Sequence, residues 1–156
     1  MNQPSEMRSR FLELTGQIVQ WLGGVPRPLP GPLPDPSVVE TACIELKSGG
    51  ISLRLMHCGT EDYTRLLILE CALGVAVTKD RAEFLKILLA LNLESWPRVL
   101  SLDSQSDSVI CTWTFQLSET DMHAVLVHCA EAASLSAKWQ SDGFLAPVQS
   151  AMSFFN

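Results

Sequence analysis

Two His-Cys dipeptides, His57-Cys58 and His128-Cys129, are the residues of this chain best suited to nucleophilic or metal chemistry. An imidazole beside a thiol can act as its base, and both groups bind transition metals. Adjacent residues point to opposite faces of a strand and diverge by about 100° on a helix, so neither dipeptide can direct both side chains to one ion. A site would need one residue from each pair. We therefore expect buried single cysteines beside surface histidines.

The other common signatures of catalysis are missing from the sequence. It contains no GxGxxG, P-loop, GxSxG or HExxH motif. The paired carboxylates, Glu61-Asp62 and Glu119 with Asp121, fall in a turn and at a helix start, where solvation and the helix dipole account for them. The four tryptophans lie at apolar positions of their elements, which favours core packing over ligand stacking. We therefore expect that the protein is not an enzyme and that it has no catalytic residue, no cofactor and no metal site.

Charge and cysteine usage narrow the class of protein further. The chain has 156 residues, enough for one domain with a real core, and a net charge of -6. No Lys/Arg cluster breaks the acidic background, so nucleic acid is a poor candidate partner. Five cysteines are spread singly without a CxxC pair, which favours a reducing cytoplasm. The N-terminus lacks the apolar run of a signal peptide, and we expect no membrane insertion.

Hydrophobic periodicity predicts eight elements in the order α-β-β-β-α-β-β-α. We expect an α+β fold with a twisted, mainly antiparallel sheet and helices packed against it, as a single domain over 1–156. Residues 23–37 form a proline-rich connector, and 144–156 a C-terminal tail. The predicted helices are Ser5 to Leu22, Asp80 to Pro97, and a last helix that a capping box at Ser118 starts and Gly143 ends. The predicted strands are Val38 to Leu46, Ile51 to Leu55, Arg65 to Val77 with a bend or bulge at Gly74, Arg98 to Asp103, and Ser108 to Leu117.

The middle helix is apolar over more of its circumference than one core needs. One stripe of this helix consists of Phe84, Ile87, Leu88 and Leu91. Leu85 and Leu89 lie beside it and widen the apolar arc to roughly 200°. These additional apolar residues indicate that the helix also contacts a second copy of the chain. Four surplus leucines across a two-fold axis contribute roughly 6 to 12 kcal/mol, against an association cost of roughly 4 to 15 kcal/mol, so neighbouring residues must take part. The predicted dimer interface is Leu85, Leu88, Leu89 and Leu91.

With these elements in place, the chain resembles the type III secretion chaperones of the Tir-chaperone family over almost its whole length. The resemblance rests on the first amphipathic helix, the apolar strand Leu66 to Leu73, and the last helix ending near Trp139. Its most suggestive piece is the run Leu88-Leu89-Ala90-Leu91-Asn92 just before a strand. A strand-turn-strand with Leu100 and Leu102, then Trp113 and Phe115, completes the pattern.

The resemblance implies a homodimer in the bacterial cytoplasm, built through the middle helix and its neighbouring strand. It implies binding of an extended N-terminal segment of a secreted effector, no nucleotide hydrolysis, and the secretion ATPase as a further partner. The residues expected to bind the partner are Phe11, Leu14 and Ile18 of the first helix. The proline-rich insertion departs from the pattern, because a short loop is expected there.

Two other functions stay open on the sequence alone. In the first, the apolar surplus lines a pocket of a small-ligand-binding or catalytic α+β domain, and a His-Cys pair supplies the chemistry. In the second, the chain is a chaperone-like regulator of secretion that binds another small regulator. Bound ligand or metal would indicate the former, and the identity of a copurified protein separates the latter from an effector chaperone.

Overall fold

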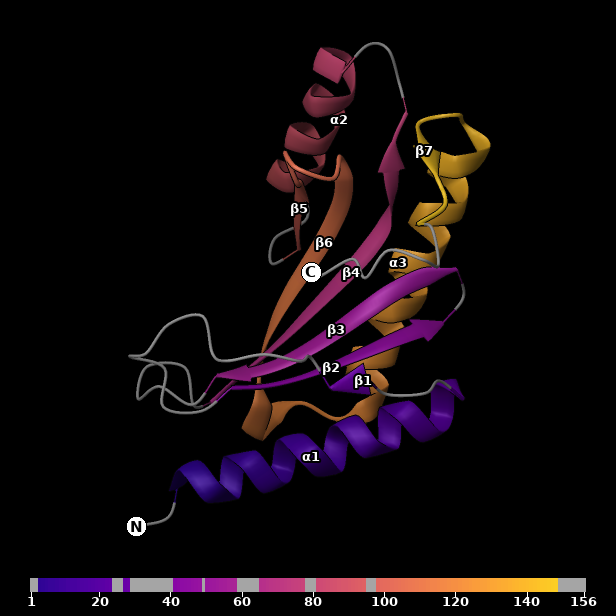
Figure 1. The fold of residues 1–156 in the computed structure, drawn as a ribbon. Coiled ribbons are helices and arrows are strands. Elements are labelled where there is room, and N and C mark those ends of the chain that lie inside the picture. Colours follow the sequence, from indigo (N-terminus) through magenta and orange to yellow (C-terminus); the bar gives the residue numbers. More distant parts are fainter. Residues whose placement is uncertain are drawn as a thin grey trace.

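One antiparallel sheet organises the protein, and helices pack against it (Figure 1). The computed structural model describes residues 3–23, 27–28, 41–48, 50–58, 65–77, 81–94 and 98–148. Within these ranges the sheet has seven strands in the order β1-β2-β3-β4-β6-β5, and β7 pairs with β4 off this path. Every strand pair is antiparallel. The expected α+β class and element order are therefore confirmed.

The strands follow the predicted segments closely and add short ones. The long strands are β2 (Thr41–Ser48), β3 (Ile51–Cys58), β4 (Leu66–Ala76) and β6 (Ser108–Gln116), and the edge strand β5 covers Val99–Leu102. The sequence predicts neither β1 (Arg27–Pro28), in the proline-rich connector, nor β7 (Leu145–Ala146), in the tail. Residues 29–37 of the connector and 149–156 of the tail lie outside the described residues.

Gly74 allows β7 to join the sheet. The register of β4 shifts between Ala72 and Gly74, as the predicted bulge requires, and Gly74 has a φ of 151°. A Cβ atom at this position would lie 2.6 Å from the carbonyl oxygen of Ala146. Only a residue without a side chain lets the tail strand approach β4 this closely.

The helices are α1 (Gln3–Leu22), α2 (Arg81–Glu94) and α3 (Met122–Ser141), with a short 3-10 helix at Leu117–Glu119. The predicted capping box at Ser118 is wrong, because Ser118 belongs to the 3-10 helix. Asp121 is the N-cap of α3 instead, and its carboxylate accepts a hydrogen bond of 2.9 Å from the backbone N–H of Ala124. The 3-10 helix precedes α3, which runs behind β2 and β3 in the view of Figure 1.

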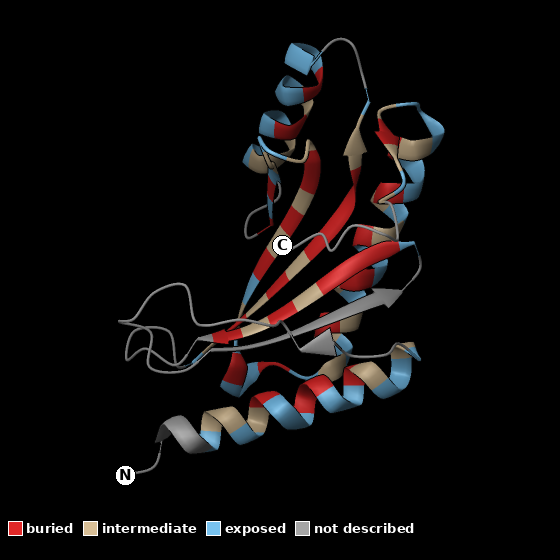
Figure 2. Ribbon diagram, viewed as in Figure 1, coloured by how far each residue is buried: buried red, intermediate tan, exposed pale blue. Residues whose placement is uncertain are grey.

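The core lies on the sheet face that α1 and α3 cover (Figure 2). Alternate residues of β3, β4 and β6 point to this face, and Leu53, Leu69 and Trp113 are at most 2% exposed. The predicted apolar face of the strand β6 and the residue after it is confirmed: Val109, Cys111, Trp113 and Leu117 are buried and Phe115 is partly buried.

Candidate functional site

The histidines of the two His-Cys dipeptides lie in separate aromatic clusters, and the side chain of Cys58 lies outside the described residues. His57 of β3 is 2% exposed and stacks on Phe11 of α1, with ring centroids 5.3 Å apart. His128 of α3 contacts the rings of Trp113 and Phe115 at 5.2 and 5.4 Å. The expected pattern of a buried cysteine beside an accessible histidine holds for His128-Cys129. It fails for His57, which the packing of α1 removes from the surface.

Two of the described cysteines, Cys71 and Cys111, are poorly suited to nucleophilic chemistry, whereas a hydrogen bond from the Cys71 thiol lowers the pKa of Cys129, which is itself buried in the core. Cys71, Cys111 and Cys129 are free and buried. Burial raises the pKa of Cys71 well above its usual range and the pKa of Cys111 to about 12, because the core disfavours a thiolate. In the described ranges no group of three His, Cys, Asp or Glu side chains is placed to hold a metal ion. No helix in those ranges is long and apolar enough to cross a membrane.

Helix α2 divides its apolar residues between the core and the surface. On the inner side, Phe84 is fully buried between Trp139 and Phe144, with centroid distances of 5.6 and 5.5 Å. On the outer side, Leu85, Leu89 and Leu93 repeat every four residues and form a row that we name the α2 surface. They are 37%, 64% and 89% exposed.

The division places the four residues of the predicted dimer interface differently, and the interface itself stays a prediction. Leu88 is only 2% exposed, because it lies one turn after Phe84 and packs in the same core. Leu91 is partly buried and packs against that core as well, as does Ile87. Leu85 and Leu89 are accessible, as expected. The sequence reading missed Leu93, although its spacing from Leu89 continues the row.

Asn92 lies in the last turn of α2, which ends at Glu94, before the predicted end at Pro97. Its side chain reaches the neighbouring strand β5. The amide Nδ2 donates to the carbonyl oxygen of Leu100 at 2.8 Å, and Oδ1 accepts from the backbone N–H of the same residue at 2.6 Å. The Leu-Leu-x-x-Asn run thus holds one buried leucine, one exposed leucine and one residue that fixes α2 to the sheet.

The residues of α1 expected to bind a partner are in the protein's own core. Phe11, Leu14 and Ile18 are 0% exposed, so a partner cannot reach them while α1 is packed as in this structure. The stripe they form is narrow enough for one surface to cover it entirely. Its C-terminal end behaves differently: the prediction that Trp21 packs in the core is wrong, because Trp21 is 70% exposed.

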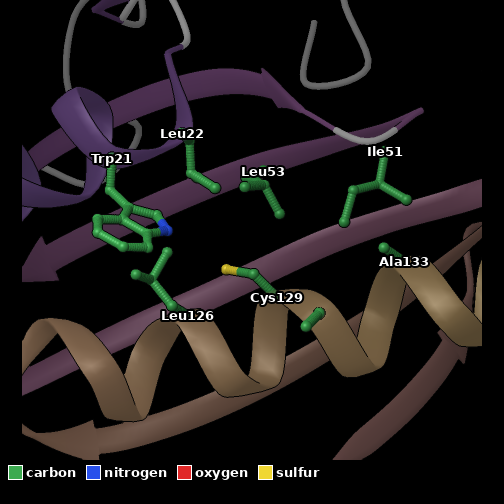
Figure 3. Close-up of a pocket in the computed structure, with 8 residues that line it drawn as sticks. Trp21, Leu22, Ile51, Leu53, Leu126, Cys129 and Ala133 are labelled. Carbon is green, nitrogen blue, oxygen red and sulfur yellow. The ribbon is translucent and has the colours of Figure 1, made fainter.

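Trp21 stands over an apolar pocket of about 200 Å³ between three elements. In Figure 3 the side chains of α1, β3 and α3 point toward one another around it. The lining is Trp21, Leu22, Ile51, Leu53, Leu126, Cys129, Ala130 and Ala133, with no charged residue. The sequence reading missed this pocket because its three walls are far apart in the chain. The available signal was a large aromatic residue at the end of an already complete stripe.

Comparison with known proteins identifies the fold. No protein-family model matches the sequence, and no curated protein matches it. Three solved structures do share its architecture. The ExsC-ExsE complex matches with a TM-score of 0.57 and 16% identity, over 96% of this chain and 100% of that chain. The HopA1-SchA chaperone-effector complex matches with a TM-score of 0.54 and 14% identity, over 85% of this chain and 94% of that chain. YbjN from E. coli, a putative transcription regulator, matches with a TM-score of 0.54 and 11% identity, over 87% of this chain and 96% of that chain.

At these identities the likeness establishes the fold. The chain has the chaperone fold that its resemblance to the type III secretion chaperones implies, over nearly the full length of both chains. The described residues add two accessible apolar features to this fold, the α2 surface and the pocket beneath Trp21.

Proposed function

We propose that the protein is a secretion chaperone that acts as a homodimer in the bacterial cytoplasm and holds the N-terminal segment of a secreted effector in a soluble, export-competent form. One observation carries this proposal: a row of leucines on α2 stays outside the core of a well-packed chain whose fold is that of a chaperone bound to its effector. Exposed apolar rows of this kind mark protein-binding surfaces.

The α2 surface supports the dimer. Leu85, Leu89 and Leu93 offer exposed apolar area, and Val99 of β5, a strand that α2 contacts, is 43% exposed. Burying these residues against their two-fold copies contributes on the order of 10 kcal/mol. This value falls within the roughly 4 to 15 kcal/mol that association costs. The interface is therefore sufficient only if side chains of neighbouring elements such as β5 add to the contacts of the helix row.

The pocket beneath Trp21 supports binding of the effector. It is apolar, carries no charge, and lies at the outer rim of α1 and α3, where an extended segment can lay a side chain into it. In this proposal the pocket replaces the buried stripe of Phe11, Leu14 and Ile18 as the contact for the client. Trp21 contributes most, because large aromatic side chains dominate binding energies at such positions.

Copurification tests the proposal directly. The tagged protein is isolated from its native cytoplasm, its bound proteins are identified by mass spectrometry, and the mass of the complex is measured by light scattering. We expect two copies of the chain with one exported protein, bound through its N-terminal segment. A monomer without a bound protein would contradict both parts of the proposal. The same sample shows whether the secretion ATPase is a partner.

A chaperone-like regulator is the second candidate, and the shared fold of YbjN, a putative transcription regulator, favours keeping it. Copurification separates the two, because a regulator brings down another regulatory protein instead of an exported one. A small apolar ligand in the pocket is the third outcome of the same experiment. Native mass spectrometry would then show a bound compound that Trp21→Ala removes.

A further inference from the structure

Strand β5 forms one end of the strand order, so one of its edges does not face another strand of the described sheet. It pairs with β6 through Val99↔Thr112, Leu100↔Cys111, Ser101↔Ile110 and Leu102↔Val109. Successive residues of an antiparallel strand direct their N–H and C=O groups to alternate sides. An open edge of this kind is a template for pairing with a further strand.

Leu100 directs its backbone groups away from β6, since both of them bind Asn92. The side-chain amide of Asn92 offers one donor and one acceptor, as a paired strand would at this position. The two contacts are 2.8 and 2.6 Å, within the range of strong hydrogen bonds. Asn92 thus satisfies the edge of β5 from within the same chain.

The short length of β5 makes one such contact decisive. The strand has four residues, and by alternation only Leu100 and Leu102 direct their groups to the outer edge. With Leu100 occupied, an added strand could pair only at Leu102. A single paired residue cannot offset the ordering of an extended segment, which costs roughly 1 to 2 kcal/mol for each residue fixed.

Both ends of this arrangement are held by buried contacts. Leu100 is 3% exposed, and its side chain packs in the core. Arg98, at the start of β5, is 9% exposed, and its guanidinium contacts the Glu131 carboxylate of α3 at 3.0 Å. Phe84 and Leu88 fix α2 on its inner side. The amide of Asn92 is therefore presented to the edge by elements that are themselves anchored.

We propose that Asn92 determines the binding specificity of this side of the molecule by closing the β5 edge to strand addition. A second copy of the chain then meets side chains of the α2 surface and not a free backbone edge, which excludes continuous pairing of β5 with β5 and the open-ended assemblies that it would permit. The inference rests on the proposed function in one respect only: that the molecule facing the α2 surface is a second copy of this chain.

The test uses Asn92→Ala, with Lys86→Ala as the matched control on the exposed side of the same helix. The probe is a fluorescently labelled peptide with the sequence of residues 98–103, RVLSLD, and binding is measured by fluorescence anisotropy. We expect Asn92→Ala to bind the peptide at least tenfold more tightly than the wild type and Lys86→Ala. Amide hydrogen exchange at Leu100 should become at least tenfold faster in Asn92→Ala alone.

Asn92→Asp addresses the case in which the alanine variant fails to fold. Its carboxylate still accepts from the Leu100 N–H but places an acceptor against the Leu100 carbonyl oxygen, so the edge is half closed. We expect peptide binding between those of the wild type and Asn92→Ala. Equal peptide binding by the wild type and a folded Asn92 variant, or unchanged exchange at Leu100, would overturn the inference. A monomeric wild type with a protected Leu100 amide would instead reject the dimer and keep the closed edge.

Discussion

Helices α1 and α2 carry similar apolar patterns and use them differently. The stripe of α1 is narrow, and its central residues Phe11, Leu14 and Ile18 are fully buried. The apolar arc of α2 is wider, and only Phe84 and Leu88 are fully covered, while Leu89 and Leu93 remain more than half exposed. The width of an apolar arc therefore decides how much of it the protein's own core can cover.

The largest expected effect concerns the α1 core. Phe11→Ala removes a fully buried ring that stacks on His57, so we expect a loss of about 3 to 5 kcal/mol in the free energy of unfolding. Leu12→Ala, one position away and 52% exposed, should change it by less than about 0.5 kcal/mol. Urea unfolding measures both. Equal losses would mean that α1 does not pack with this face inward.

The next effect separates the two sides of α2. Leu88→Ala should cost about 2 to 5 kcal/mol in the free energy of unfolding, because it leaves a cavity beside Phe84. Leu89→Ala should leave the folded protomer intact and raise the dissociation constant of the dimer about tenfold or more. Sedimentation across a range of concentrations measures the dimer. If Leu89→Ala dissociates no dimer, the outer row of α2 is not the interface.

A smaller effect is expected at the outer end of α1. Trp21→Ala removes one wall of the pocket and should weaken effector binding by about 1 to 3 kcal/mol, without unfolding the protein, since Trp21 is 70% exposed. The readout is the amount of effector that copurifies with each variant. Leu12→Ala is the control, because it changes an exposed leucine of α1 outside the pocket. Unchanged recovery with Trp21→Ala would exclude the pocket as the client site.

The smallest effect is a pH dependence of the core that the helices share. Burial raises the pKa of Cys111 to about 12, so the folded protein keeps this proton at pH values where the unfolded chain releases it. The free energy of unfolding keeps its full value below the ordinary thiol pKa, and it falls as the pH rises toward 12. At pH 10 the loss is about 1 to 2 kcal/mol. Cys111→Ala should flatten this part of the stability curve, and an unchanged curve would contradict the assignment.

The sequence predicted the long elements and the surplus on α2 because both follow from hydrophobic periodicity. It also located the bulge at Gly74, since an isolated glycine in an apolar strand indicates a bulge or a close approach of another backbone segment. It could not show whether Leu88 is buried in the core or exposed, because the width of an apolar arc indicates how much surface must be covered and not which edge of the arc faces the core. The pocket beneath Trp21 depends on contacts between distant segments, and the bonds of Asn92 depend on how α2 lies against β5, neither of which periodicity encodes.

The most direct test of the contrast between α1 and α2 is the solution mass of the wild type and of the double variant Leu85→Glu with Leu89→Glu, measured by light scattering. The account predicts about twice the protomer mass of 17.1 kDa for the wild type. It predicts a folded monomer, or aggregate, for the variant, because charges on the α2 surface oppose burial in the interface. A wild type at 17.1 kDa, or a double variant that remains a dimer, would contradict it.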